Sequence, residues 1–352
     1  MLDRSSEEER LIEEIKKIKK EVGDNLVILA HHYQRSDIVD LADFSGDSFE
    51  LSQKGAQSQR ANHIVFCGVH FMAESAAILA GPHQVVQIPD EHAGCPMADM
   101  ADIHNVEKAW EELASVIDTG RITPVVYMNS DADLKAFSGR NGGLVCTSSN
   151  APAAFEWAFG RSEKVFFFPD QHLGRNTGKE MGIPPEEMIV WDPQKPFGGN
   201  SREEIKRARI ILWNGYCLVH TRFKTEHVRE MRERFPEARI VVHPECTEEV
   251  VALSDAVGST GYIVKYVKEA APGSTIIVGT EINLVKRMAQ ENPDKKVFDL
   301  HNSLCANMFK IDLKKLLWTL ENIGKVNVVT VSDTIKEDAR KALKRMLDLP
   351  AS

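Results

Sequence analysis

The segment LVILAHHYQ, residues 26–34, joins an uninterrupted apolar run to a group of polar side chains. The run at 26–30 has no apolar/polar alternation, which is typical of a strand buried on both faces of a parallel sheet. Similar runs follow along the chain: 64-IVF-66, 124-PVVYM-128, 165-VFFF-168, 239-RIVV-242 and 275-TIIVG-279. Longer helical patterns separate them, so the sequence predicts an α/β protein whose parallel sheets are covered by helices.

Amphipathic helices are predicted near both ends of the chain. Residues 6–21 place Leu11, Ile12, Ile15 and Ile18 on one stripe, the spacing of a helix with one buried face. Two further helical patterns, 311–322 and 334–348, close the chain.

The unit that begins with LVILAHHYQ recurs twice. The first copy passes through GDS and FCGVHFMAE to VVQIPD and Cys95. The others run from PVVYMNS through CTSSN and FFFPDQHLG to Cys217, and from RIVVHPEC through GSTG and IIVGTEINL to Cys305. In the three copies 17, 19 and 17 residues separate the strand-end polar residue from the hydroxyl loop. The sequence therefore predicts three homologous α/β domains, at 1–102, 103–222 and 223–352, with an insertion near 174–200 in the second.

Composition limits the class of protein. With 352 residues, 43% hydrophobic and 27% charged, the chain is long enough for two or three globular domains. A net charge of −9 argues against broad nucleic-acid binding. No apolar run approaches the roughly 18 residues of a membrane span, and the charged N-terminus is unlike a signal peptide. We expect a cytoplasmic protein with no membrane partner, in which six cysteines stay reduced.

Three of the six cysteines share one position in the repeat. Cys95, Cys217 and Cys305 each lie four or five residues after a short apolar run. Packing of the copies about a pseudo-threefold axis would bring these thiols together as a metal centre with an open coordination position. Zinc with a water ligand and an iron–sulfur cluster both fit that set. Cys67 and Cys146 end apolar runs and are interpreted as buried hydrophobic side chains, and Cys246 is left out of the cluster.

Polar side chains follow the first strand of each copy. They are His31 and Tyr33, Tyr127 and Asn129, and His243 and Glu245. Ligands of parallel α/β units collect at these carboxyl ends of strands. The hydroxyl loops 46-GDS-48, 147-TSSN-150 and 258-GSTG-261 each precede a helical pattern, so they are either ordinary N-caps or sites for a multiply anionic substrate.

Two other patterns remain without a role. LGRNTGKE at 173–180 resembles a phosphate loop, but it has three residues between its glycines, and Glu180 stands where Ser or Thr should bind magnesium. His220 either supports the loop of Cys217 or caps a turn, and the sequence does not decide between these.

Nine short motifs, in order, resemble the quinolinate synthase family, and the resemblance extends from about residue 20 to 345. The motifs are AHHYQ at 30–34, GDS at 46–48, CPMA at 95–98, YMNS at 127–130, CTSSNA at 146–151, HPEC at 243–246, GSTG at 258–261, GTEI at 279–282 and CANM at 305–308. His32 departs from the family, which often has Tyr or Asn there. Cys305 lacks the CxxCxxC of some members, so no regulatory disulfide is expected at this position.

The resemblance implies three α/β domains about a pseudo-threefold axis and one [4Fe–4S] cluster on Cys95, Cys217 and Cys305, with one iron left open. It implies condensation of iminoaspartate with dihydroxyacetone phosphate to quinolinate, phosphate and water in NAD biosynthesis. Functional coupling to L-aspartate oxidase or aspartate dehydrogenase would supply the imine. A non-enzymatic iron–sulfur sensor or scaffold and a zinc-dependent hydro-lyase remain as alternatives.

The resemblance also assigns roles to individual residues. The substrate-binding residues that it implies are His31, Ser48, Tyr127, Met128, Asn129, Ser148, His243, Pro244, Glu245 and Thr260. Glu245 and His243 are the candidates for proton transfers during dehydration and ring closure, and His31 and Tyr33 for isomerisation of the triose. The hydroxyls of Ser48, Ser148 and Thr260 would hold carboxylates or phosphate.

Overall fold

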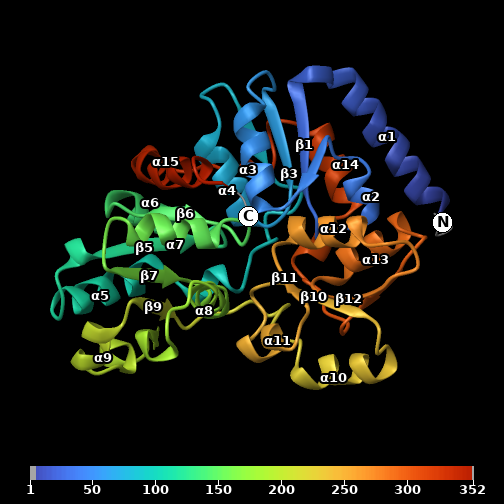
Figure 1. Cartoon of the computed structure of the whole chain (residues 1–352). Helices are drawn as coiled ribbons and strands as arrows, with labels where there is room; N and C mark the ends of the chain where they lie inside the picture. Colours follow the sequence, from blue (N-terminus) through green and yellow to red (C-terminus); the bar gives the residue numbers. More distant parts are fainter. Residues whose placement is uncertain (1–4, 351–352) are drawn as a thin grey trace. The chain divides into compact units, whose positions relative to one another are not determined.

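The computed structural model describes residues 5–350 and divides the chain into two compact units. The first unit comprises Met1–Cys95 and Cys305–Ser332, and the second comprises Pro96–Leu304 and Asp333–Ser352. Together they contain three sheets, each made only of parallel strands, and Figure 1 shows the helices that flank each sheet. The predicted α/β class with three sheets is confirmed. The domain boundaries and the pseudo-threefold axis stay predictions.

The first unit contains a four-stranded sheet in the order β2-β1-β3-β4. Its strands are β1 (Leu26–His31), β2 (Phe44–Gly46), β3 (His63–Cys67) and β4 (Val85–Gln87). Its helices are α1 (Ser6–Val22), α2 (Ser36–Val39), α3 (Ser48–Gln57), α4 (His70–Leu79) and α14 (Leu313–Glu321), with short turns η1 (Gly23–Asn25) and η6 (Met308–Lys310). The predicted helix at 6–21 is α1, which packs against α14 and buries Leu11, Ile12 and Ile15.

The second unit contains two sheets, of which the five-stranded one has the order β6-β5-β7-β9-β8. Its strands are β5 (Ile122–Tyr127), β6 (Leu144–Cys146), β7 (Lys164–Phe168), β8 (Met188–Trp191) and β9 (Ile210–Trp213). The accompanying helices are α5 (Ile103–Ala114), α6 (Ala132–Arg140), α7 (Ala151–Phe159), α8 (Gln171–Glu180), α9 (Arg202–Arg207) and α15 (Asp333–Leu347), with turns η2 (Ala98–Met100), η3 (Thr119–Arg121), η4 (Pro185–Glu187) and η5 (Pro196–Gly199). The edge strand β8 lies within the segment 174–200.

The other sheet of the second unit has four strands in the order β11-β10-β12-β13. They are β10 (Arg239–Val242), β11 (Ala256–Val257), β12 (Thr275–Gly279) and β13 (Lys296–Asp299), with helices α10 (Thr225–Arg234), α11 (Glu248–Ala252), α12 (Thr260–Glu269) and α13 (Ile282–Glu291). Its central strands, β10 and β12, are buried except at their first residues, Arg239 and Thr275, in agreement with their apolar sequences.

All three sheets share one topology, and individual contacts repeat with it. In each, the first strand is central, the second lies outside it, and the third and fourth follow on its other side. In the first sheet the N–H of Ile28 donates to Asp43 at 2.7 Å, and in the third the N–H of Ile240 donates to Asp255 at 2.7 Å. The second sheet adds only the edge strand β8 to this plan.

Helix α15 completes the second unit by packing on α6 and β6. Its buried stripe consists of Ala339, Ala342, Leu343 and Met346. The helices meet at Gly139, where an added Cβ would stand 1.9 Å from the carbonyl oxygen of Asp338. Arg345 also donates to the carbonyl of Gly143. The C-terminal helix is thus fixed by close backbone packing as well as by apolar burial.

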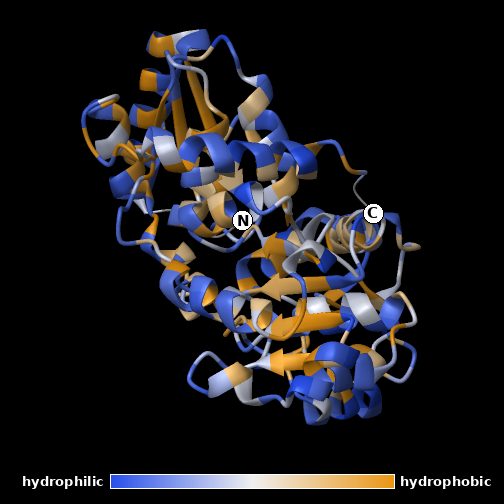
Figure 2. Ribbon diagram, turned by 90° about the vertical axis from the view of Figure 1, so that its left-hand side faces the viewer, coloured by the Kyte–Doolittle hydropathy of each residue, from blue (hydrophilic) through white to orange (hydrophobic). Residues whose placement is uncertain are grey.

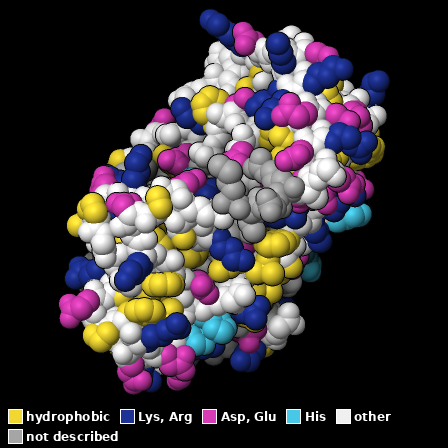
Figure 3. Space-filling model, turned by 90° about the vertical axis from the view of Figure 1, so that its right-hand side faces the viewer, with side chains coloured by type: hydrophobic (Ala, Val, Ile, Leu, Met, Phe, Trp, Pro, Cys, Tyr) yellow, Lys and Arg dark blue, Asp and Glu magenta, His cyan; other side chains and the backbone are white. Residues whose placement is uncertain are grey.

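Hydropathy follows the layers of the fold. Figure 2 shows strands coloured mainly as hydrophobic, flanked by helices in which hydrophilic and hydrophobic residues are mixed. On the face drawn in Figure 3, basic and acidic side chains are interspersed. Within residues 5–350, no helix combines the length and apolarity needed to cross a membrane.

Candidate active site

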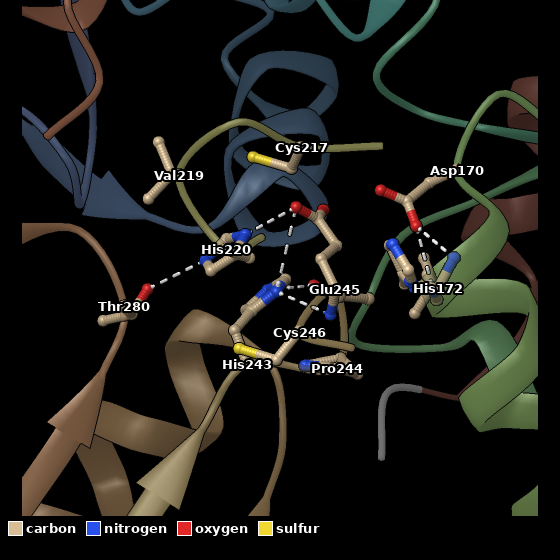
Figure 4. A network of polar contacts seen from close by, with 12 residues as sticks. Asp170, His172, Cys217, Val219, His220, His243, Pro244, Glu245, Cys246 and Thr280 are labelled. Atoms are coloured by element: carbon tan, nitrogen blue, oxygen red, sulfur yellow. Dashed lines mark hydrogen bonds and ion pairs between the residues drawn. The ribbon is translucent and has the colours of Figure 1, made fainter. Parts of the chain in front are cut away.

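Polar side chains at the carboxyl ends of strands in the second unit meet around Glu245 (Figure 4). Tyr127 ends β5, and Glu245 stands three residues after the end of β10. His220 follows β9, and Thr280 follows β12 directly. All four side chains are buried, and Glu245 is only 2% exposed. A charged group at this depth needs several hydrogen-bond partners.

Both carboxylate oxygens of Glu245 have such partners. The Tyr127 hydroxyl donates to Oε1, and Nδ1 of His220 lies 2.7 Å from Oε2. On its other side, Nε2 of His220 is 3.3 Å from the hydroxyl of Thr280. The rings of His220 and His243 stack with their centroids 4.3 Å apart. Side chains from four strand ends therefore hold one carboxylate in place.

The electrostatics of this group favour an ionised Glu245 beside a neutral His243. Burial raises the pKa of Glu245, but the charges of His220 and His243 and hydrogen bonds from His220 and Tyr127 lower it to about 2. Burial, helped by the charge of His220, lowers the pKa of His243 to about 3. Because His243 is then neutral near pH 7, the charge interaction with His220 and the hydrogen bonds from His220 and Tyr127 are what favours the Glu245 carboxylate there.

The two contacts of the His243 ring indicate which of its nitrogens carries the proton. The backbone N–H of Glu245 donates to Nδ1 at 3.3 Å. In the neutral ring Nε2 therefore carries the proton. Nε2 lies 3.2 Å from the hydroxyl of Ser148, so His243 presents a donor to this serine.

Asp170 adds a second buried carboxyl near Glu245. One oxygen accepts hydrogen bonds from the N–H groups of His172 and Leu173, both at 2.8 Å, and caps α8. Figure 4 shows the other oxygen directed away from the helix. Burial raises the pKa of Asp170 well above its ordinary value, and the charge of Glu245 raises it further, whereas a backbone hydrogen bond with Cys217 lowers the pKa of this carboxyl.

The hydroxyl loops do not all have the same local role. Asp47 and Ser259 are N-caps of α3 and α12, each accepting a backbone N–H, as the simpler interpretation of the sequence expects. Ser148 instead contacts His243. Ser148, Pro244 and Ser259 line one cavity of about 450 Å³. Thr260, the first residue of α12, is buried.

The remaining predicted residues of the second unit lie close to this group. Met128 is buried, and its N–H donates to the carbonyl of Cys146 at 2.8 Å. Asn129 is half-buried immediately after it. The pairing of Tyr127 with Cys146 places the second hydroxyl loop beside the end of β5.

The first unit holds its own group at the end of β1. His31 is buried, and its ring meets that of Tyr33 edge-on at 4.7 Å between centroids. The N–H of Tyr33 donates to Nδ1 of His31 at 3.2 Å. The pairing of His31 with Gly46 places the GDS loop and Ser48, the first residue of α3, beside this strand end.

A backbone hydrogen bond gives the three candidate thiols the same structural position. In each copy of the repeat, the first residue of the helix after the third strand donates its N–H to the carbonyl two residues before the cysteine. The pairs are His70 to Ala93 at 2.8 Å, Gln171 to Gly215 at 2.9 Å and Ile282 to Ser303 at 2.8 Å. The positional equivalence inferred from the sequence therefore has a counterpart in three dimensions.

Two of these cysteine loops are linked within the first unit. Lys310, five residues after Cys305, donates to the carbonyl of His92 at 2.6 Å. Lys315 forms an ion pair with Asp90 at 2.6 Å. The loops that carry Cys95 and Cys305 are thus joined by two lysines.

Burial separates the three candidate thiols from the other three cysteines. Cys95, Cys217 and Cys305 are half-buried, whereas Cys67, Cys146 and Cys246 are fully buried. Burial raises the pKa of Cys67 to about 12 and raises those of Cys146 and Cys246 as well. A protonated thiol is a poor metal ligand, so burial favours the half-buried set.

Several residues of the network were not assigned to the site from the sequence. His220 had two open interpretations, and its contacts with Glu245 and Thr280 now support a role in the site. Thr280 follows the apolar run 275–279 directly, and Asp170 follows the run 165–168 after Pro169. This position at a strand end is the signal that could have identified them. Donor atoms of Cys217, His220 and Glu245 also lie within 4.8 Å of one another, a grouping that could hold a metal ion.

Comparison with known proteins gives consistent matches over nearly the whole chain. A family model described as quinolinate synthetase A protein matches residues 13–348. A protein of Rhodopirellula baltica named quinolinate synthase is 48% identical over 98% of this chain and 92% of its own length. Proteins of that name from Listeria monocytogenes (49% identity; 96% of this chain, 93% of the relative) and Corynebacterium glutamicum (46%; 98% and 89%) are similarly close.

Proposed function

This chain belongs to the quinolinate synthetase A family, and we propose that it condenses iminoaspartate with dihydroxyacetone phosphate to quinolinate, phosphate and water. The observation that carries the proposal is the buried Glu245 carboxylate, held between Tyr127 and His220 at the ends of strands. Condensation and dehydration need groups that accept and return protons, and this network supplies them.

Proton transfer is assigned first to Glu245 and His243. Glu245 is ionised and accepts the hydrogen bond of the Tyr127 hydroxyl, so it can receive a proton directly or through Tyr127. His243 is neutral and presents Nε2–H toward Ser148 at 3.2 Å, so it can donate a hydrogen bond that polarises a substrate oxygen. The proton acceptor and the hydrogen-bond donor are thus two residues apart on one loop.

Binding and isomerisation are assigned to the strand-end groups of both units. The hydroxyls of Ser48, Ser148 and Thr260 would hold the carboxylates and phosphate of the substrates, aided by the helices that begin beside them. Tyr127, Met128, Asn129 and Pro244 would complete the binding surface. In the first unit, His31 and Tyr33 are in contact and would move protons during isomerisation of the triose.

We assign one [4Fe–4S] cluster to Cys95, Cys217 and Cys305. Their half-buried thiols and the backbone hydrogen bond that recurs before each of them fit a set of three equivalent ligands. When bound, such a cluster supplies an iron with an open position, which acts as a Lewis acid toward a departing hydroxyl.

A zinc-dependent hydro-lyase is the competing function that one observation favours. Cys217, His220 and Glu245 offer sulfur, nitrogen and oxygen donors within 4.8 Å of one another, and zinc accepts all three. Both oxygens of Glu245 are already hydrogen-bonded, however. An iron–sulfur sensor or scaffold without catalysis is the other alternative.

Anaerobic purification followed by metal and sulfide analysis separates these functions. The proposal expects about four iron and four sulfide per chain, and quinolinate formed from the two substrates. Zinc without iron would support the hydro-lyase. A loaded cluster without quinolinate formation would support the sensor.

Replacement of single cysteines tests the ligand assignment. We expect Cys95→Ser, Cys217→Ser and Cys305→Ser each to lower bound iron and to abolish activity. Cys67→Ala and Cys146→Ala are matched controls, since both thiols are fully buried with raised pKa values, and both should keep the iron. Loss of iron in the controls, or its retention in any of the three serine variants, would contradict the assignment.

The substrates place the enzyme in a reaction sequence. Iminoaspartate must come from oxidation of aspartate, so functional coupling to L-aspartate oxidase or aspartate dehydrogenase is part of the proposal. A cluster with thiolate ligands also agrees with the cytoplasmic location expected from the sequence.

A further inference from the structure

Helix α8 contains LGRNTGKE, the phosphate-loop-like sequence at 173–180 that the proposed function leaves without a role. The whole motif lies within the helix, so it cannot form a loop around a phosphate. Gly174 and Gly178, one turn apart, face the sheet. An added Cβ would stand 2.4 Å from a methyl group of Leu212 at Gly174, and 2.6 Å from Ile210 at Gly178. The glycines let α8 lie close against β9.

Asn176, between these glycines, reaches the loop that carries Glu245. Its side-chain amide donates to the carbonyl of Pro244 at 2.7 Å and to that of Cys246 at 2.9 Å. These carbonyls belong to the residues on either side of Glu245. Asn176 is 8% exposed, so water competes little for these hydrogen bonds.

The other backbone hydrogen bonds of this loop are made by N–H groups. That of His243 donates to the carbonyl of Gly279 at 3.2 Å, and that of Glu245 to Nδ1 of His243 at 3.3 Å. Cys246 closes a turn onto the carbonyl of His243 at 3.0 Å, and the following helix, α11, has five residues. Within residues 5–350, no other group is seen to donate to the carbonyls of Pro244 or Cys246. The amide of Asn176 therefore holds the Pro244–Glu245 peptide plane directly before Glu245 and the Cys246–Thr247 plane beyond it. The two contacts bracket Glu245 and help to set the direction of its side chain.

We infer that Asn176 is a positioning residue for Glu245, and that α8 transmits the position of the five-stranded sheet to the catalytic loop. The orientation of its amide follows from these contacts, because both carbonyls require the NH₂ end. Its Oδ1 accepts no hydrogen bond within the described residues, so Asn176 acts here only as a donor. The inference rests on the proposed function, in which Glu245 transfers protons.

Replacement of the amide tests the inference. Asn176→Leu keeps the side-chain volume and removes both N–H donors of the amide. Asn176→Ala is a second variant, for use if the leucine variant does not fold, because its smaller side chain leaves room for water. We expect kcat to fall by about 10- to 100-fold, since displacement of a catalytic group by about 1 Å has effects of this size, while KM changes by less than about threefold. Two unpaired carbonyls should also lower Tm by about 2–8 °C.

Lys179→Met is the matched control. Lys179 lies on the same helix and contacts the same segment through an ion pair with Glu248 at 2.7 Å, in which the lysine side chain is 52% exposed. Because an exposed pair contributes little, kcat should stay within about twofold of the wild-type value.

A double-mutant cycle with Glu245→Gln separates positioning from general stabilisation. If Asn176 acts through Glu245, Asn176→Leu should lower kcat in the wild-type background but not in the Glu245→Gln background, while Tm falls in both. If turnover of Glu245→Gln is undetectable, Glu245→Asp serves as the second background for kcat, because its shorter side chain already withdraws the carboxylate.

The outcomes are distinguishable. Unchanged kcat in folded Asn176→Leu and Asn176→Ala, or an equal loss in both backgrounds, would overturn the inference. Failure of the wild-type holoenzyme to form quinolinate would instead overturn the proposed function.

Discussion

His243 is stacked on His220 and shielded from solvent, so its ionisation bears on stability. The folded state lowers its pKa from an ordinary value of 6.5 to about 3. Below pH 6.5 the unfolded chain therefore binds a proton that the folded chain does not. The contribution of His243 to stability is present above pH 6.5 and is lost as the pH falls toward 3.

We predict that the free energy of unfolding falls by about 2 kcal/mol between pH 7 and pH 5 because of His243. His243→Asn should remove this part of the pH dependence, whatever its effect at pH 7. Urea denaturation of both proteins at each pH measures the difference. Parallel pH profiles for the two proteins would show that His243 does not cause it.

Helix α8 is the element that joins the five-stranded sheet to the loop of Glu245. Its contacts with Leu212 and Phe167 at Gly174 leave no room for a Cβ, since the nearest atoms would be 2.4 and 2.5 Å away. Alanine has the higher intrinsic helix propensity by about 1 kcal/mol. The packing conflict acts in the opposite direction, at about 1–3 kcal/mol or more.

We predict that Gly174→Ala lowers the free energy of unfolding by about 1–2 kcal/mol. Gly160→Ala, at the end of α7, is the control, because its Cβ would meet only the carbonyls of Glu156 and Trp157, both at 3.5 Å. Urea denaturation should show the control to be as stable as the wild type. Equal stability of the two variants would mean that α8 can move away from the sheet without loss.

At the scale of the whole molecule, the second unit contains a helix from the far end of the chain. Helix α15 packs on α6 through Gly139, whose Cα lies against the backbone of Asp338. Backbone atoms cannot move aside as a flexible side chain can. Any Cβ at residue 139 must therefore displace one helix.

We predict that Gly139→Ala increases the rate of cleavage in the segment 322–333 by about tenfold in limited proteolysis. This increase corresponds to a fall of about 1.4 kcal/mol in the free energy of local opening. Gly55→Ala in α3 is a suitable control, because its Cβ would stand at an ordinary 3.6 Å from Leu29. Mass spectrometry of the fragments locates the cut. Equal cleavage rates in the variant and the control would argue against this role for Gly139.

The sequence predicted those parts of the fold that depend on long apolar runs. Every such run became a strand, because burial on both faces leaves an unbroken signal. The edge strands β2, β6, β8 and β11 were not predicted. They have two to four residues, too few for a recognisable pattern.

For the site, local motifs identified residues but not their partners. Tyr127, His243 and Glu245 were selected from strand ends, and the structure brings them into one network with Ser148. The contacts of His220 and Asn176 join segments far apart in sequence, which a single sequence cannot reveal. The catalytic roles themselves stay predictions.

The hydrogen bond that precedes each candidate thiol joins backbone atoms only. Its donors are His70, Gln171 and Ile282, and its acceptors are Ala93, Gly215 and Ser303, so no side-chain identity is kept at either end. Tandem duplication followed by divergence leaves such a trace, because selection on backbone geometry allows side chains to drift. Whether the three copies share an ancestor should therefore be tested by comparing the positions of their backbone hydrogen bonds, which can stay the same after the residue identities have changed.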